Sequence, residues 1–173
     1  MNKVSTPHQL ARLVSYIALQ LALANRITLL HTGFCFVYVG FLLSMPWRQV
    51  NLVASLFLGF AVGCLLDLFY DTLGLHAFAC VLLVYARAFL LKRMLPLSSY
   101  ETGAQPTLND MGIKSFSIFV LVLVALHHGA LFGLDAWDSA LWGIGLRKAA
   151  LSTILTYLAV VTVQKFALLV RSQ

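Results

Sequence analysis

Two carboxylates and a histidine stand in an otherwise apolar stretch, GFAVGCLLDLFYDTLGLHAF, which runs from Gly59 to Phe78. Asp67, Asp71 and His76 could act as acid and base, line an ion path, or fix the end of a membrane helix. An intramembrane aspartyl protease needs two carboxylates that converge from different helices and share a proton. Because Asp67 and Asp71 follow one another along a single segment, the sequence favours a structural or partner-binding role.

The remaining reactive side chains predict no enzyme. The sequence lacks HExxH, GxSxG and a P-loop Gly-Lys-Ser/Thr, the usual signatures of zinc proteases, serine hydrolases and nucleotide-binding proteins. His127 and His128 are adjacent, so on a helix they point about 100° apart and do not share one metal. We expect at least one of them to face a neighbouring helix and hydrogen-bond there, with partner contact and catalysis as the alternatives. The three cysteines have no CxxC spacing and are expected to be packing residues. No metal and no cofactor is predicted.

The composition predicts that these residues lie on membrane-spanning helices. Hydrophobic residues make up 61% of the 173 residues, charged residues 10%, and the mean hydropathy is +0.89. These values indicate a polytopic membrane protein. A bilayer core about 30 Å thick takes about 20 helical residues to cross, so the chain has room for about six spans. The fold class is therefore an all-α membrane protein with a single polytopic membrane domain.

The six predicted spans are continuously apolar, which favours helices over the alternating pattern of a membrane barrel. Their approximate limits are 10–25, 27–45, 50–68, 73–91, 115–134 and 149–170. The first span is the weakest, because it contains several polar residues and ends in a sequence resembling a signal-peptide cleavage site. The polar segment 92–114 is expected to form a cytoplasmic loop, whose central part 98–109 is either a connector or a docking element.

The loop charges predict that both termini are cytoplasmic. With this orientation the inner side receives most of the basic residues, which is the positive-inside pattern. These are Lys3, Arg12, Arg48, Lys92, Arg93, Lys114, Lys165 and Arg171. Contact with anionic membrane lipid then explains the net charge of +6, with a docking surface for an acidic partner as the alternative, and no nucleic acid is required.

The opening stretch also has a helical pattern. Gly59, Gly63, Asp67 and Asp71 are spaced by four residues, so they form a narrow stripe on one helix face. The two glycines would let another helix approach closely, either within this chain or from a partner. Asp71 is expected to cap the next helix after a turn at Gly74, with His76 in that helix's first turn. A capped hairpin and a partner- or ligand-binding surface both fit this pattern.

The segment from Gly59 to Ala77, with its Gly-x-x-x-Gly-x-x-x-Asp pattern followed by LFYDTLGLHA, resembles the signature of MreD, the bacterial rod shape-determining membrane protein family. Further similar segments are VYARAFLLKRMLP, which contains Arg87, LHHGALF, which contains His127 and His128, and LSTILTYL. The resemblance covers nearly the whole chain and is to the Bacteroidetes branch of the family.

The resemblance implies a non-enzymatic scaffold of the cell-elongation (rod) complex in the bacterial inner membrane. Its implied partners are the bitopic protein MreC, the RodA glycosyltransferase, a class B transpeptidase and the cytoskeletal protein MreB. The family's six-helix bundle also resembles the substrate-binding subunits of vitamin transporters, so the alternative function is small-molecule binding. The residues implied in partner contact or helix packing are Gly59, Gly63, Asp67, Asp71, Gly74 and His76, and secondarily Arg87, His127 and His128.

Overall fold

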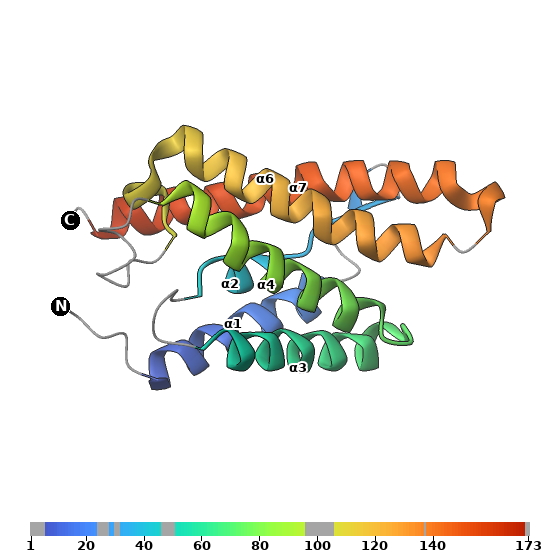
Figure 1. Cartoon of the computed structure of the whole chain (residues 1–173), viewed down its shortest axis with the longest axis horizontal. Helices are drawn as coiled ribbons and strands as arrows, with labels where there is room; N and C mark the ends of the chain where they lie inside the picture. The colour runs from blue at the N-terminus through green and yellow to red at the C-terminus, as the bar shows by residue number, and fades with distance from the viewer. Residues whose placement is uncertain are drawn as a thin grey trace.

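The computed structural model describes residues 6–23, 28–29, 32–45, 51–95, 106–136 and 138–171, which form a helical bundle (Figure 1). Its helices are α1 (Thr6–Leu23), α2 (Tyr38–Leu43), α3 (Leu52–Tyr70), α4 (Leu75–Met94), α6 (Leu108–Asp135), the short 3-10 helix η1 (Ser139–Leu141) and α7 (Trp142–Arg171). Two strands of two residues each, β1 (Thr28–Leu29) and β2 (Gly33–Phe34), pair antiparallel.

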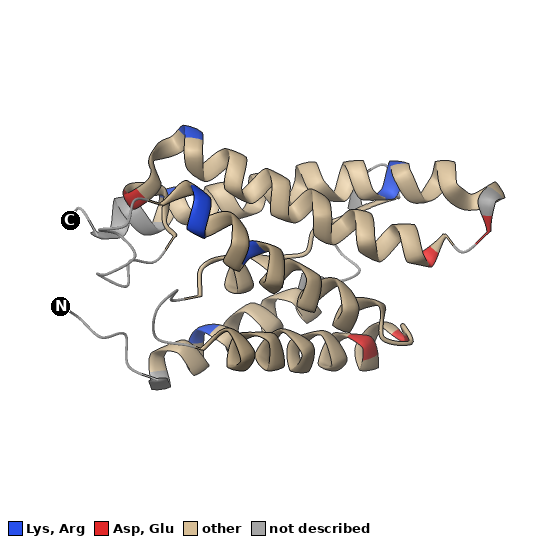
Figure 2. Cartoon of the chain, in the orientation of Figure 1, with Lys and Arg blue, Asp and Glu red and all other residues tan. Residues whose placement is uncertain are grey.

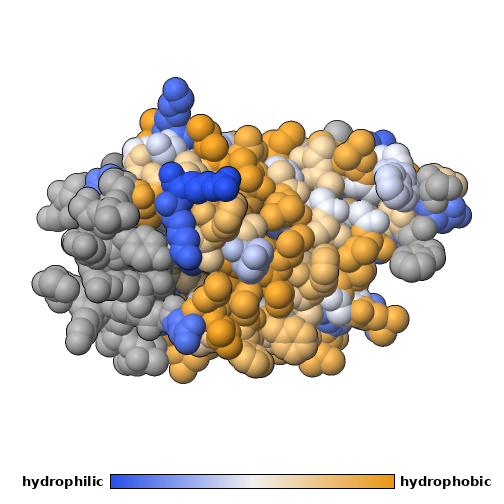
Figure 3. Space-filling model, in the orientation of Figure 1, coloured by the Kyte–Doolittle hydropathy of each residue, from blue (hydrophilic) through white to orange (hydrophobic). Residues whose placement is uncertain are grey.

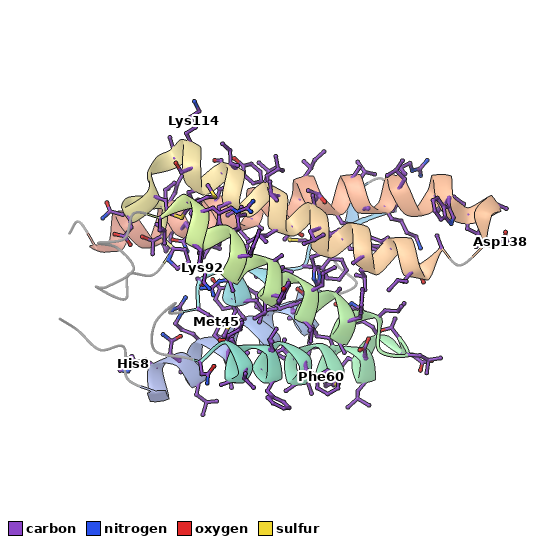
Figure 4. The ribbon with its side chains drawn as sticks, viewed as in Figure 1. His8, Met45, Phe60, Lys92, Lys114 and Asp138 are labelled. Atoms are coloured by element: carbon purple, nitrogen blue, oxygen red, sulfur yellow. The ribbon has the colours of Figure 1, made fainter. Side chains whose placement is uncertain are left out.

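Four helices of the described chain are long and apolar enough to cross a membrane: α3, α4, α6 and the part of α7 from Trp142 to Phe166. They correspond to the predicted third, fourth, fifth and sixth spans. Large apolar side chains on their outer surfaces are exposed, including Leu68 at 82% and Phe57 at 70%. Hydrophobic residues cover the middle of the face shown in Figure 3, and Phe60 points away from the bundle in Figure 4. Such a surface suits lipid contact, which makes this a membrane protein.

The second predicted span, 27–45, is wrong as a single helix. Its described residues form the short β1–β2 pair, an irregular stretch and then the six residues of α2. This segment lies against α1, α4 and α7 and is buried from Phe36 to Met45. The predicted first span corresponds to α1, which is helical but is not among the four helices that meet the length and hydropathy criteria.

Polar side chains from other helices explain why this segment need not be helical. Backbone groups inside a bilayer must find partners within the protein, because lipid offers none. The N–H of Phe34 donates to the Ser152 hydroxyl at 2.9 Å, and the N–H of Phe36 donates to the Thr156 hydroxyl at 3.0 Å. The buried Gln20 amide bonds two further backbone groups of the segment. Partners on α1 and α7 thus replace the bonds that a helix would have made internally.

The predicted loop 92–114 is shorter in the structure, because α4 continues to Met94 and α6 begins at Leu108. Gly112 interrupts α6 with φ of +71°, a conformation that suits glycine, so the first turn bends away from the rest of the helix. Much of the segment 98–109 lies outside the described residues.

The start of α1 and the end of α7 lie at the same end of the bundle, opposite the α3–α4 and α6–α7 turns (Figure 1). Most of the described basic residues lie toward the first end and most of the described aspartates at the other, where Arg147 and Lys148 also lie (Figure 2). Lys92 and Lys114 mark the basic end and Asp138 the acidic end in Figure 4. The basic end also contains Asp110. The polar residues of the opening stretch, from Asp67 to His76, lie at the acidic end, where α3 turns into α4.

Candidate functional site

Asp67 joins the end of α3 to the start of α4. One carboxylate oxygen, Oδ1, accepts from the His76 N–H at 2.9 Å, and the other, Oδ2, accepts from the Ala77 N–H at 3.0 Å. The Thr72 hydroxyl also donates to Oδ1, at 2.6 Å. An anion that receives the free N–H groups of a helix start is a cap, and the helix dipole favours its charge.

The prediction that Asp71 caps this helix is wrong. Asp71 ends α3 in the left-handed conformation, with φ of +53°, and its side chain is exposed. The chain reverses just after Asp71 and passes through Gly74, which has φ of +88°. Because of this tight reversal, the start of α4 lies beside Asp67, one helical turn before Asp71, and Asp67 accepts its free N–H groups.

The hydrogen bonds around Thr72 show which ring nitrogen of His76 carries a proton. Thr72 has one hydroxyl proton, which it donates to Asp67 Oδ1, so its oxygen must accept from His76 Nδ1 at 2.8 Å. The same Nδ1 lies 3.2 Å from Asp67 Oδ1, which also requires a donor. His76 Nδ1 therefore carries a proton. In the neutral ring Nε2 is then an acceptor, and among the described residues it has no hydrogen-bond partner.

Gly59 and Gly63 face α4 of the same chain. A Cβ atom on Gly63 would lie 2.6 Å from the Ala77 nitrogen and closer still to its Cα, so the two backbones touch here. A Cβ atom on Gly59 would lie 3.0 Å from Val84 Cγ2. Of the two alternatives for this glycine pair, the structure places it against an internal helix, and α4 fills the space that a partner would need.

His127 and His128 are both fully buried and have different partners. His127 Nε2 lies 2.7 Å from the Tyr38 hydroxyl, and His128 Nδ1 lies 3.3 Å from the Thr153 hydroxyl. Thr153 donates its proton to the Ala149 carbonyl at 2.7 Å, so it accepts from His128, and Nε2 of His128 is a second buried acceptor without a partner among the described residues. The expected contact with neighbouring elements is confirmed for both histidines.

Aromatic rings connect the histidines into one cluster. The Phe36 ring lies between His76 and His128, with centroid distances of 5.9 and 5.1 Å. The Tyr70 ring stacks on His76 at 5.1 Å, and Tyr38 contacts both His76 and His127. Sequence reasoning missed both tyrosines, although a Tyr within an apolar run is a polar group that needs a partner.

Arg87 has a structural position within the membrane-spanning part of α4. It is 3% exposed, and its Nε donates to the Leu43 carbonyl at 3.0 Å. Its guanidinium also donates to the Met45 carbonyl. These two carbonyls lie at and just after the C-terminal end of α2, where no further helical N–H group is available to bond them. Arg87 therefore caps the short helix, and its charge complements the negative end of the helix dipole.

Among the described residues, Phe132 of α6 borders a small hollow and a larger one. The first, of about 180 Å³, includes His76, Tyr70 and Phe36 in its lining and reaches the Asp135–Lys148 ion pair, whose N–O distance is 3.2 Å. The second, of about 460 Å³, is an apolar groove. It is lined by Phe78 of α4, by Gly129, Ala130, Phe132, Gly133, Leu134 and Ala136, and by Trp142, Gly145, Leu146 and Ala149 of α7.

Among the described residues, no group of three or more His, Cys, Asp or Glu side chains is arranged to hold a metal ion. Comparisons with protein-family models, curated proteins and solved structures find no significant match. Membership of the MreD family therefore stays a prediction from the sequence segments alone, and the geometry of the described residues supplies the candidate binding surfaces.

Proposed function

We propose that this chain is a non-enzymatic, MreD-like scaffold of the rod complex in the bacterial inner membrane. It binds the single span of an MreC-like bitopic protein and, through it or directly, the RodA glycosyltransferase, its class B transpeptidase partner and MreB. The role is to support lateral peptidoglycan synthesis and cell shape. Four similar sequence segments support the family, and the apolar groove on α6 supports a helical partner.

The groove carries this proposal because its two glycines on α6 are open, unlike the glycines of α3, whereas Gly145 on the α7 side packs against α6. Cβ atoms added at Gly129 and Gly133 would meet nothing within 4 Å, and these two glycines are four residues apart on one face of α6. In lipid, helices associate by close packing against small residues, because the hydrophobic effect gives no drive between apolar helices. A partner span in this groove would cover Gly129 and Gly133 as α4 covers Gly63.

Gly133→Leu tests the groove. The leucine would fill the space left for a partner backbone, so we expect recovery of a co-expressed MreC-like partner to fall at least about tenfold, which corresponds to about 1.4 kcal/mol of association free energy. The measurement is quantitative co-purification from membranes. Gly143→Leu is the matched control, because a Cβ there also meets nothing within 4 Å and Gly143 lies outside the groove. Full partner recovery with a correctly folded Gly133→Leu variant would reject this surface.

The proposed orientation places the basic end in the cytoplasm. The described basic residues at that end are Arg12, Lys92, Arg93, Lys114 and Lys165. Loops rich in Lys and Arg stay in the cytoplasm. A fluorescent protein fused after Gln173 should therefore fluoresce, and phosphatase fused at the same position should be inactive. Phosphatase fused to a chain truncated after Asp138 should be active, because that position lies outside the cytoplasm. Paired phosphatase and fluorescent-protein fusions measure both positions. Outside activity from the Gln173 fusion would reverse the scheme.

A second candidate, a small-molecule binding subunit like those of vitamin transporters, is favoured by the non-helical crossing at Gly33–Val37. Transporter sites often lie where a membrane crossing is discontinuous. However, the hollow beside it measures about 180 Å³, whereas sites for drug-sized ligands measure about 300–1,000 Å³. Identifying what accompanies the protein purified from its native membrane separates the two functions. An MreC-like protein favours the scaffold, and a stoichiometric metabolite favours the alternative.

A further inference from the structure

Exposed basic side chains lie on two neighbouring helices at the basic end of the bundle. Lys92 and Arg93 belong to the last turn of α4, and Lys114 lies near the start of α6. All three residues are exposed, and α4 and α6 pack against one another. Basic side chains border the hydrophobic band of the face shown in Figure 3, and Figure 4 places Lys92 and Lys114 at the same end. These three residues, called here the basic rim, therefore lie where the apolar helix surface ends.

Arg93 lies against the apolar surface of α4. Its guanidinium carbon is 4.2 Å from the centroid of the Phe89 ring, and Phe89 is 54% exposed. Helical side chains lean toward the N-terminus of their helix, and α4 begins at the acidic end, so Arg93 reaches back from the basic end toward the membrane (Figure 1). A guanidinium over a ring face can still donate through its N–H edge. Arg93 is thus held at the depth of lipid head groups.

Lys114 has a similar arrangement on α6, which runs in the opposite direction. Because α6 begins at the basic end, the residue one turn deeper on the same helix face is Ile118, four positions later. Ile118 is 48% exposed. Each of the two helices therefore presents a cation near its end and an exposed apolar side chain one turn deeper. A phospholipid has the same order, with its phosphate at the surface and its acyl chains inside.

The basic rim has little negative charge around it. The two ion pairs found among the described residues both lie at the acidic end. Of the described acidic residues, Asp110 alone lies near the basic rim, and its carboxylate accepts from the Thr107 hydroxyl at 2.6 Å. Basic residues at a membrane surface attract anionic lipid, each with a free energy of about 1 kcal/mol. The basic rim therefore fits an anion that the membrane supplies.

We propose that the basic rim binds the phosphate of one anionic phospholipid, such as phosphatidylglycerol. The Arg93 guanidinium donates two N–H groups to the phosphate, which is the geometry that favours arginine at phosphate sites. Lys114 supplies a second cation from α6, and the acyl chains lie on Phe89 and Ile118. This is one defined site, in addition to the general attraction of basic loops to an anionic leaflet. It is separate from the apolar groove beside Phe132 and stands whether or not the chain is an MreD-like scaffold.

The test compares two short-chain lipids on the purified full chain in neutral detergent. Dioctanoyl phosphatidylglycerol is expected to bind at least about tenfold more tightly than dioctanoyl phosphatidylcholine, because two cations act on its phosphate. In phosphatidylcholine the choline group cancels the phosphate charge and competes with both side chains. Affinities are measured by thermophoresis, and native mass spectrometry gives the number of lipids bound.

Three variants locate the binding. Arg93→Gln should lower the affinity for phosphatidylglycerol about fivefold or more, because it removes one of the two cations. Phe89→Leu keeps the charge but removes the ring under the guanidinium, and it should lower the same affinity about twofold or more. Arg147→Gln is the charge-matched control, since Arg147 is also exposed but lies near the start of α7, at the acidic end. It should change neither affinity. All three substitutions change exposed side chains, and size exclusion checks that each variant stays folded.

Equal binding of the two lipids by the unmodified chain would overturn the proposal. Equal losses in Arg93→Gln and Arg147→Gln would also reject it, because they would indicate a general effect of charge. An unchanged affinity in Phe89→Leu would contradict the placement of Arg93 on the ring. Competition by soluble glycerol 3-phosphate at the concentration of the lipid would assign the basic rim to a soluble phosphate and reject the lipid source. Binding of a glutamate-rich peptide without binding of phosphatidylglycerol would reject it in favour of a protein partner.

Discussion

Gly63→Ala is expected to lower the stability of the isolated protein by about 3 kcal/mol or more, although it adds only one methyl group. The new Cβ would lie 2.6 Å from the Ala77 nitrogen and 2.7 Å from the His76 carbonyl oxygen, and no rotamer change relieves a clash with backbone. The helices α3 and α4 would have to separate, and overpacking of this kind costs about 1–3 kcal/mol or more. The measurements are the unfolding temperature in detergent and the fraction of monodisperse protein on size exclusion.

Two glycine controls test whether the loss of stability depends on the close approach of α3 and α4. Gly59→Ala should cost less, because its nearest contact is a Val84 side-chain methyl at 3.0 Å, which can move. Gly133→Ala should be close to neutral, because its Cβ would meet nothing within 4 Å. Equal stability of the Gly63 and Gly133 variants would contradict the close approach of α3 and α4. The same comparison separates folding from partner binding, since Gly133→Leu is expected to lose the partner while the protein stays folded.

The four long spans were predictable from sequence because hydropathy alone detects them. The helices α3 and α4 are apolar over 19 and 20 residues and begin or end within a few residues of the predicted limits. The segment 27–45 is also apolar, and hydropathy does not distinguish a helix from an irregular chain whose backbone finds partners elsewhere. Those partners, Ser152 and Thr156, are about 120 residues away in sequence. Such pairings depend on tertiary structure.

The site was predictable in part for a similar reason. The stripe from Gly59 to Asp67 was visible because residues four apart share a helix face, and the structure uses that face for packing and capping. The choice of Asp67 over Asp71 as the cap depends on the tight reversal at Asp71 and Gly74, both with positive φ. The period of a helix contains no information about how the chain turns after it. The contact between Tyr38 and His127 was not predictable for the same reason, because these residues are 89 positions apart and meet only in the tertiary structure.

Asp67→Asn should show how much the α3–α4 connection depends on a carboxylate. The asparagine keeps the size of the side chain but replaces one acceptor oxygen by a donor, which would then face either the Ala77 N–H or the Thr72 and His76 donors. Hydrogen bonds to charged groups contribute about 1.5–3 kcal/mol each, and a buried donor that faces another donor is left unpaired. We therefore expect a loss of about 2–4 kcal/mol in the free energy of unfolding, and faster hydrogen exchange of the His76 and Ala77 amides.

Asp71→Asn is the matched comparison for this substitution. It removes the same charge four residues later, at an exposed position, and asparagine tolerates the left-handed conformation that Asp71 adopts. Its effect should stay within about 0.5 kcal/mol, as for most surface substitutions. Hydrogen exchange of peptides covering residues 72–80 then distinguishes a local cap from a general charge effect. Faster exchange in both variants would indicate that negative charge at this end stabilises the turn. Faster exchange in Asp67→Asn alone would assign the stabilisation to the bonds that Asp67 accepts from the start of α4.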